Sequence, residues 1–185
     1  MEVTTTPIEG LLILKPQVFP DDRGYFMESF NKITFEAAAQ LSCDFVQDNE
    51  SYSELNVIRG LHFQIPPFHQ GKLVRVSKGK VLDVAVDLRI DSPTFGQHQA
   101  IELSDSNKLQ FWIPPGFAHG FRSLEKGSIV CYKCTQVYNG AVERALKWDD
   151  ADLGINWGDA QVLVSDKDNQ APAWVDIELP ENWEF

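Results

Sequence analysis

The chain has few cysteines and no long hydrophobic run. Its 185 residues include only three cysteines, Cys43, Cys131 and Cys134, an odd number that argues against a disulfide scaffold. Residues 1–7 contain neither a basic nor an apolar stretch, so we expect no signal peptide. The longest apolar runs, such as residues 11–14, are far too short to span a bilayer. We therefore predict a cytoplasmic protein without a membrane partner.

Positive charge is also scarce. The 16 Lys and Arg residues against 27 Asp and Glu residues give a formal net charge of −11, and such a surface repels the phosphates of nucleic acids. The chain has no G-x-G-x-x-G pattern and no P-loop, so neither a bound dinucleotide nor ATP chemistry is indicated. These absences argue against a nucleic-acid partner. They still allow a small anionic substrate, held by a few cations inside a cavity.

The residues that are present indicate a single domain over residues 1–185. The hydrophobic fraction of 43% and the charged fraction of 23% are those of an ordinary folded protein, and no repeat or linker interrupts the chain. One helix is expected at about residues 33–41, where consecutive alanines favour it and Asn31 or Thr34 would cap it. From Trp148 onwards we expect loops and short helical turns that wrap the domain.

Most of the remaining pattern is typical of β-strands. In residues 81–90 apolar and polar side chains alternate strictly, which places Asp83 and Asp87 on the face opposite the apolar residues. Shorter strands are expected at residues 98–103, 109–113 and 128–138. Regular short strands separated by turns indicate a sandwich or a barrel.

A histidine motif makes the barrel more specific. The pattern Pro114-x-Gly116-x-x-His119 is the second half of the cupin signature, in which a Pro-Gly turn brings a histidine to the mouth of a barrel. The first half would place two histidines one residue apart, but here the residues are His62 and Gln64, which face the same side of a strand. A three-histidine metal site is therefore incomplete. We predict a mainly β, cupin-type double-stranded β-helix (jelly-roll barrel) with a few short helices and no metal.

Cys131-Tyr-Lys-Cys134 matches the C-x-x-C pattern of zinc and redox sites. The sequence has no second pair for zinc and no βαβ setting for a redox role. In a strand, the two thiols would face opposite sides. We therefore assign this motif no function.

Several longer motifs follow one another along the chain. They are Asp22-Arg-Gly24, Gln47-Asp-Asn49, Arg59-Gly-Leu-His-Phe-Gln64, Gln70-Gly-Lys-Leu-Val-Arg75, Asp83-Val-Ala-Val-Asp-Leu-Arg89 and Pro114-Pro-Gly-Phe-Ala-His-Gly120. Together, over about residues 7–175, they resemble the dTDP-4-dehydrorhamnose 3,5-epimerase family. The resemblance implies a homodimer that needs no cofactor and inverts C3 and C5 of a dTDP-4-keto-6-deoxy sugar. The expected reaction converts dTDP-4-dehydro-6-deoxy-D-glucose to dTDP-4-dehydro-L-rhamnose, in dTDP-L-rhamnose biosynthesis.

The resemblance also implies roles for individual residues. His62 would be the base and Tyr132 the acid. Asp168 would lie behind His62, and Lys72 would lie near the ketone. Tyr138 would stack on the nucleobase. Substrate contacts would come from Arg23, Glu28, Gln47, Asn49, Arg59, Lys72, His119, Tyr138, Glu143 and Lys167.

Ketone chemistry explains why these residue types are suitable. A proton beside a ketone is weakly acidic, and histidine is a base whose ordinary pKa lies near neutral pH. A carboxylate on its other ring nitrogen would fix the tautomer, and a cation such as Lys72 would stabilise the enolate oxygen. Inversion needs a second proton carrier on the opposite face. If residues 128–138 form one regular strand, Tyr132 and Tyr138 share a side and point into one cavity.

Several alternatives stay open beside this interpretation. Considered alone, His62 is equally well a hydrogen-bonded barrel histidine, and Tyr132 is more often a half-buried strand tyrosine. Relatives that invert only C3 or only C5 share the same base and acid. Gln64 argues against a metal-dependent cupin enzyme. A non-catalytic sugar-nucleotide-binding module would need the pocket but not the proton carriers.

Overall fold

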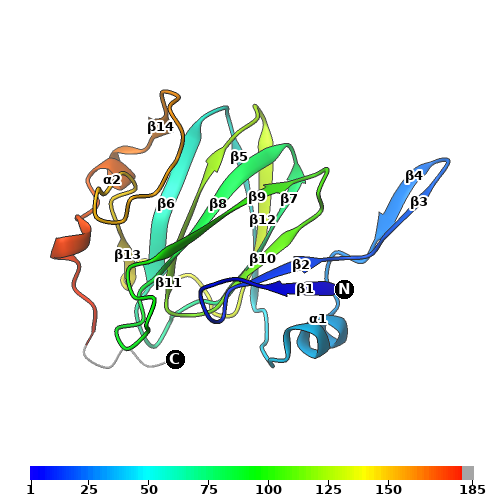
Figure 1. The fold of residues 1–185 in the computed structure, drawn as a ribbon, viewed down its shortest axis with the longest axis horizontal. Coiled ribbons are helices and arrows are strands. Elements are labelled where there is room, and N and C mark those ends of the chain that lie inside the picture. Colours follow the sequence, from blue (N-terminus) through cyan, green and yellow to red (C-terminus); the bar gives the residue numbers. More distant parts are fainter. Residues whose placement is uncertain (181–185) are drawn as a thin grey trace.

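Two β-sheets that face each other form the body of the chain, of which the computed structural model describes residues 1–180 (Figure 1). In spatial order, the first sheet consists of β1 (Glu2–Thr5), β2 (Leu12–Lys15), β10 (Gln110–Ile113), β7 (Lys72–Lys78), β12 (Ser128–Cys134) and β5 (Gln47–Ser53). The second consists of β13 (Glu143–Ala145), β6 (Val57–Gln64), β11 (Phe117–Ser123), β8 (Lys80–Asp87) and β9 (His98–Ser104). A short strand, β14 (Leu163–Val164), pairs in parallel with β6. This is the predicted mainly β jelly-roll barrel with few helices.

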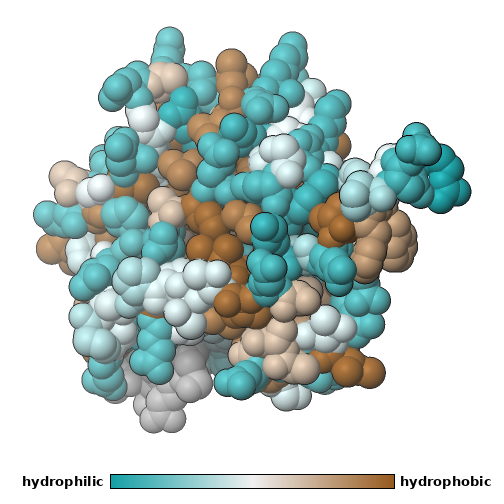
Figure 2. All heavy atoms as spheres, turned by 45° about the vertical axis from the view of Figure 1, so that its right-hand side comes forward, coloured by the Kyte–Doolittle hydropathy of each residue, from teal (hydrophilic) through white to brown (hydrophobic). Residues whose placement is uncertain are grey.

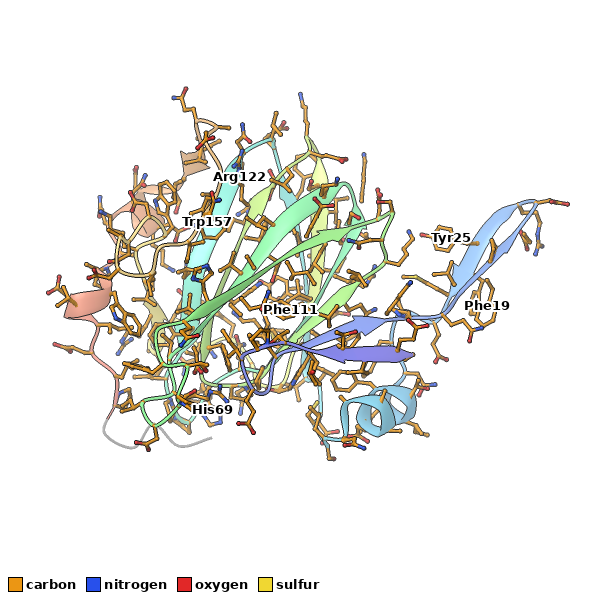
Figure 3. The ribbon with its side chains drawn as sticks, viewed as in Figure 1. Phe19, Tyr25, His69, Phe111, Arg122 and Trp157 are labelled. Atoms are coloured by element: carbon orange, nitrogen blue, oxygen red, sulfur yellow. The ribbon has the colours of Figure 1, made fainter. Side chains whose placement is uncertain are left out.

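A two-stranded hairpin stands apart from these sheets. Strands β3 (Val18–Asp21) and β4 (Gly24–Met27) form it, and it projects from the body at the right of Figure 1. Its Phe19 side chain lies well away from the barrel in Figure 3, whereas the Tyr25 hydroxyl accepts a hydrogen bond from Lys108, between β9 and β10, at 2.7 Å. Figure 2 shows the hydrophilic tip of the hairpin clear of the body, with hydrophobic residues next to it.

The helices are short and cover the outside of the sheets. Helix α1 (Lys32–Ala39) begins after Asn31, whose side chain accepts a hydrogen bond from the Thr34 amide, as a helix cap does. It ends two residues before the predicted position because Gln40 is left-handed, with φ of 55°. Phe35 is its buried residue and packs with Trp112 against the first sheet.

The C-terminal segment wraps the second sheet, as predicted. It contains α2 (Asp166–Asn169) and the 3₁₀ helix η1 (Trp174–Asp176), and it lies beside β6 in Figure 1. Trp157 of this segment belongs to the same buried cluster as Val84 and Val86 of β8. No helix within residues 1–180 is long and apolar enough to cross a membrane.

Strand alternation was predicted correctly where the strand is regular. On β8, Val84 and Val86 pack under the C-terminal segment, whereas Ala85 belongs to the core between the sheets, where Phe111 also lies (Figure 3). Burying a valine or phenylalanine side chain in this way contributes about 1.5–3 kcal/mol. The polar face of β8 therefore points into the barrel, and Asp83 is completely buried there.

Two strands end earlier than the sequence pattern predicts. β8 ends at Asp87, which accepts hydrogen bonds from Ser92 and Thr94 in the following turn. β12 ends at Cys134, so Tyr138 lies on the loop beyond the strand. The strand-parity argument that placed Tyr138 beside Tyr132 is therefore wrong.

Candidate active site

His62 and Asp168 form a close pair, and both line one cavity. His62 comes from β6, and its Nε2 donates to Asp168 Oδ1 at 2.6 Å. Asp168 is carried by α2, whose N-cap Ser165 accepts from the Asp168 amide, and the Gly60 amide donates to Asp168 Oδ2 at 3.4 Å. Burial alone would raise the pKa of the Asp168 carboxyl, but the His62 hydrogen bond holds it below its ordinary value. The carboxylate is therefore fixed on one side of the imidazole.

Lys72 and Tyr132 approach the same space from the other sheet. Lys72 begins β7 and is 8% exposed, and within residues 1–180 its ammonium has one hydrogen bond, 3.5 Å long, to the His62 carbonyl. Burial lowers the pKa of Lys72, partly offset by Asp83 and other nearby groups. Burial raises the pKa of Tyr132 on β12. The site thus holds an incompletely bonded cation and a neutral phenol.

These groups share a cavity of about 580 Å³, a size typical of small-molecule sites. Of the predicted residues, it is lined by Arg59, His62, Lys72, His119, Tyr132, Lys167 and Asp168. A smaller pocket of about 110 Å³ shares His62, Lys72 and Tyr132 with it. The predicted residues that line only this smaller pocket are Gln47, Asn49, Tyr138 and Glu143. The three shared side chains mark the junction of the two spaces.

Hydrogen bonds tie the wall of the smaller pocket together. Gln47 donates to Asn49 Oδ1 at 2.9 Å and accepts from the Tyr138 amide at 2.8 Å. The Tyr138 hydroxyl donates to Glu143 Oε2 at 3.1 Å, and Lys167 contacts the same oxygen. Tyr138 itself is 57% exposed, so its ring is available to a planar ligand. These contacts, rather than strand parity, bring Tyr138 to the pocket.

Arg23 and Arg59 were both predicted to contact the substrate, and the structure separates the two of them. Arg59 lines the larger cavity and donates to Ser53 Oγ at 3.1 Å and to the Tyr52 carbonyl at 2.9 Å. Arg23 is on the projecting hairpin, where it pairs with Asp21 and its side chain is 89% exposed. Glu28 follows the hairpin and accepts from Asn31. Within one chain, neither Arg23 nor Glu28 lines the two pockets.

Asp83 belongs to the site although sequence reasoning assigned it no role. Its two oxygens lie 2.9 and 3.0 Å from His119 Nε2, and both side chains are buried. Burial lowers the pKa of His119, and the Asp83 charge opposes that shift. The available signal was a carboxylate in the middle of an apolar strand, because such a charge is rarely buried without a partner.

Gln64 has a structural function at the position where a second cupin histidine would stand. Its amide nitrogen donates to the carbonyls of Phe68 at 2.6 Å and Val137 at 3.2 Å, and its oxygen accepts from the Asn139 amide at 2.7 Å. The side chain therefore holds the loop that carries Tyr138. Residues 1–180 contain no group of three or more His, Cys, Asp or Glu residues placed to hold a metal ion.

Comparison with known proteins gives a consistent result along almost the whole chain. A sequence model described as dTDP-4-dehydrorhamnose 3,5-epimerase matches residues 5–176. The dTDP-4-dehydrorhamnose 3,5-epimerases of Shigella flexneri and Pseudomonas aeruginosa are each 48% identical, covering 96% of this chain and 98% of their own length.

Solved structures agree with the sequence relatives. The Legionella pneumophila 3,5-epimerase in complex with dTDP-4-keto-L-rhamnose is 44% identical with a TM-score of 0.92, over 96% of this chain and 94% of that one. A 3′-monoepimerase from Streptomyces bikiniensis in complex with dTDP-quinovose is 32% identical with a TM-score of 0.87, over 94% and 87% of the two chains.

Proposed function

The chain belongs to the dTDP-4-dehydrorhamnose 3,5-epimerase family of isomerases, and we propose that His62 and Tyr132 carry the protons in this reaction. The substrate is dTDP-4-dehydro-6-deoxy-D-glucose and the product dTDP-4-dehydro-L-rhamnose, in dTDP-L-rhamnose biosynthesis. One observation carries the assignment of roles. His62 from one sheet and Tyr132 from the opposite sheet line the same cavity, which is the arrangement that inversion requires.

The base acts through the free nitrogen of its ring. Because Nε2 of His62 donates to Asp168, Nδ1 is left to accept the proton from C3 or C5 of the sugar. The imidazolium that forms is stabilised by the Asp168 carboxylate. The electron pair left on carbon moves to the C4 oxygen, where the Lys72 ammonium donates to the enolate.

Tyr132 completes the inversion from the other side. Its hydroxyl delivers a proton to the same carbon, and the C4 ketone forms again. Burial disfavours the phenolate, so Tyr132 holds a proton ready to donate. These side chains supply base, electrostatic stabilisation and acid, and we propose that no metal or organic cofactor takes part.

The remaining residues bind the nucleotide in this proposal. Arg59 and Lys167 meet the diphosphate, and the exposed ring of Tyr138 stacks on thymine. The smaller pocket, which Tyr138 also lines, contributes Gln47, Asn49 and Glu143 as further contacts to the nucleotide. His119, held by Asp83, lies beside the sugar.

We also propose a homodimer in which the hairpin β3–β4 reaches a second copy of the chain. Phe19, Tyr25 and Phe26 on this hairpin are 49%, 54% and 68% exposed, an apolar surface that a partner would cover. The partner would then receive Arg23 and Glu28 at its own cavity. This accounts for two predicted substrate contacts that lie outside the pockets of their own chain.

A mixing experiment tests this shared site. We expect Arg23→Ala and His62→Ala chains each to have little activity alone. The two variants are mixed, unfolded and refolded together. If the two chains pair at random, half of the dimers are mixed. In each mixed dimer, one of the two sites combines an intact His62 with the partner's intact Arg23, so about a quarter of wild-type activity returns. No recovery, or a monomer in sedimentation analysis, would contradict the proposal.

Solvent exchange tests the proton chemistry. The enzyme is incubated in heavy water with dTDP-4-dehydro-6-deoxy-D-glucose, and NMR follows C3 and C5. We expect deuterium at both positions with wild type and with the control His98→Ala, and at neither with His62→Ala.

Two other functions predict different results. The likeness to a 3′-monoepimerase favours a single-centre epimerase as the second candidate, and that enzyme would exchange one position only. A non-catalytic binding module would bind the sugar nucleotide and exchange neither position.

We propose that the enzyme works in the cytoplasm. Cys43, Cys131 and Cys134 are all free thiols, which suits a reducing compartment. Cys131 contacts Glu50 and Ser77 on the outside of the sheet, whereas Cys134 is buried. As predicted, the C-x-x-C residues face opposite sides of the strand.

A further inference from the structure

The alternation of side chains between the two faces of strand β6 is interrupted in the middle of the active site. Arg59 and His62 are three residues apart, a spacing that puts side chains on opposite faces of a regular strand. Both nevertheless line the same cavity. Ile58 and Leu61 show the same interruption, because both pack in the core cluster behind the second sheet.

The interrupted alternation arises from a β-bulge in the pairing of β6 with β11. The pairing His119 with His62 is followed by Phe121 with Arg59. Two residues of β6, Gly60 and Leu61, therefore face Gly120 alone. A bulge of this kind re-aims the side chains that follow it.

Only glycine fits at the two facing positions. Gly60 has φ of +116°, and a Cβ there would lie 2.5 Å from Gly120 Cα and 2.7 Å from the His119 carbonyl oxygen. A Cβ on Gly120 would lie 2.7 Å from the Arg59 carbonyl oxygen. These obstacles are backbone atoms, which cannot rotate away as a side chain would.

We propose that Gly60 and Gly120 are positioning residues whose backbone contact turns the base and the diphosphate-binding arginine toward one cavity. The Gly60 amide also donates to Asp168, the carboxylate that contacts His62, so the bulge helps to orient the base. This inference rests on the proposed function for the roles of His62 and Arg59.

The test compares Gly120→Ala with Gly79→Ala. Gly79 has φ of +75°, and a Cβ there would lie 2.7 Å from Ser128 Oγ and 3.1 Å from Ser128 Cα. It is in the turn between β7 and β8 and does not line the cavity. The control therefore introduces crowding and backbone strain at a turn outside the cavity, without disturbing the bulge.

Gly120→Ala should affect turnover and binding together. We expect kcat to fall by about 10²-fold and the Kd for dTDP to rise by about tenfold, because both His62 and Arg59 are displaced. His62→Ala should reduce turnover alone, and Arg59→Ala mainly the affinity. Gly79→Ala should lower thermal stability and leave kcat and Kd per folded molecule within about twofold.

If folded Gly120→Ala keeps the wild-type kcat and the wild-type Kd for dTDP, the inference is overturned. If Gly120→Ala does not fold, amide exchange at Gly60 carries the test, because Asp168→Ala should accelerate it about tenfold by removing the acceptor. Unchanged exchange would also overturn it. Binding of dTDP and amide exchange require no turnover, so an inactive wild type would count against the proposed function alone.

Discussion

The Nε2 atom of His62 lies 2.6 Å from Oδ1 of Asp168, although 106 positions separate the two residues in the sequence. Asp168 is 4% exposed and is held in place by the Gly60 amide and by the cap of helix α2. The orientation of the base is therefore set by a segment that wraps the barrel from outside. That segment is part of the catalytic site as well as of the fold.

Replacing Asp168 by Asn tests this pair. The amide keeps the shape but removes the charge that stabilises the imidazolium, so we expect kcat to fall by about 10²–10⁴-fold. The Kd for dTDP should stay within about twofold. Asp166→Asn, on the exposed side of the same short helix, is the matched control and should leave kcat unchanged. Wild-type kcat in Asp168→Asn would refute the role of the pair.

The loss of activity at high pH should come from deprotonation of Lys72 rather than from ionisation of Tyr132. Burial disfavours both charged forms, so it lowers the pKa of Lys72 from its ordinary 10.5 and raises that of Tyr132 from its ordinary 10.0. Burial thus favours loss of the Lys72 proton and retention of the Tyr132 proton, and we expect the basic limb to report deprotonation of the Lys72 ammonium. Lys72→Arg keeps its charge, so the basic limb of solvent exchange should move to higher pH, even with a lower kcat. An unmoved limb in Lys72→Arg would contradict this assignment.

Tyr138 should contribute mainly to nucleotide affinity. Stacking of a base on an aromatic ring is worth about 1–3 kcal/mol, so Tyr138→Ala should weaken dTDP binding by about tenfold to a hundredfold. Tyr138→Phe keeps the ring and loses only the exposed bond to Glu143, so its Kd should stay within about threefold. Calorimetric titration measures both, with Tyr52→Ala as an exposed tyrosine control on β5. Equal losses in the Ala and Phe variants would exclude stacking.

Asp87 should stabilise the fold in a pH-dependent way. It is fully buried and accepts hydrogen bonds from Arg89, Ser92 and Thr94. Burial alone would raise its pKa, but these bonds hold the pKa below its ordinary 3.8. Asp87→Asn should lower the free energy of unfolding at pH 7 by about 2–4 kcal/mol.

The pH dependence follows from the sign of that shift. Because the folded carboxyl has the lower pKa, its stabilisation is present above the unfolded value and is lost as the pH falls through the folded one. Urea unfolding should therefore show a smaller difference between wild type and Asp87→Asn at about pH 3 than at pH 7. Asp91→Asn, an exposed neighbour, is the control. A difference that grows on acidification would contradict the assigned direction.

Prediction from sequence succeeded where the signal was local. The alternation of β8 was correct because side chains of a regular strand alternate whatever lies beyond them. It failed for Tyr138, because the end of β12 at Cys134 depends on where the pairing with β5 and β7 stops. It also left Asp83 without a role, because a strand pattern gives the face of a residue and not its partner.

The amino-acid sequence by itself determined the mainly β class, the faces of the regular strands and the family motifs, since each depends on residues close together in the chain. Only the tertiary structure decided that Asp168 contacts His62, that Asp83 holds His119, and that Arg59 and His62 share a cavity. Arg23 lies on a hairpin directed away from its own pocket, a fact that no local pattern contained. The Asp83 contact follows from the register of β8 and β11, the shared cavity from the bulge at Gly60 and Leu61, and the Asp168 contact from the placing of helix α2 beside β6. All of them exist only once distant segments have come together.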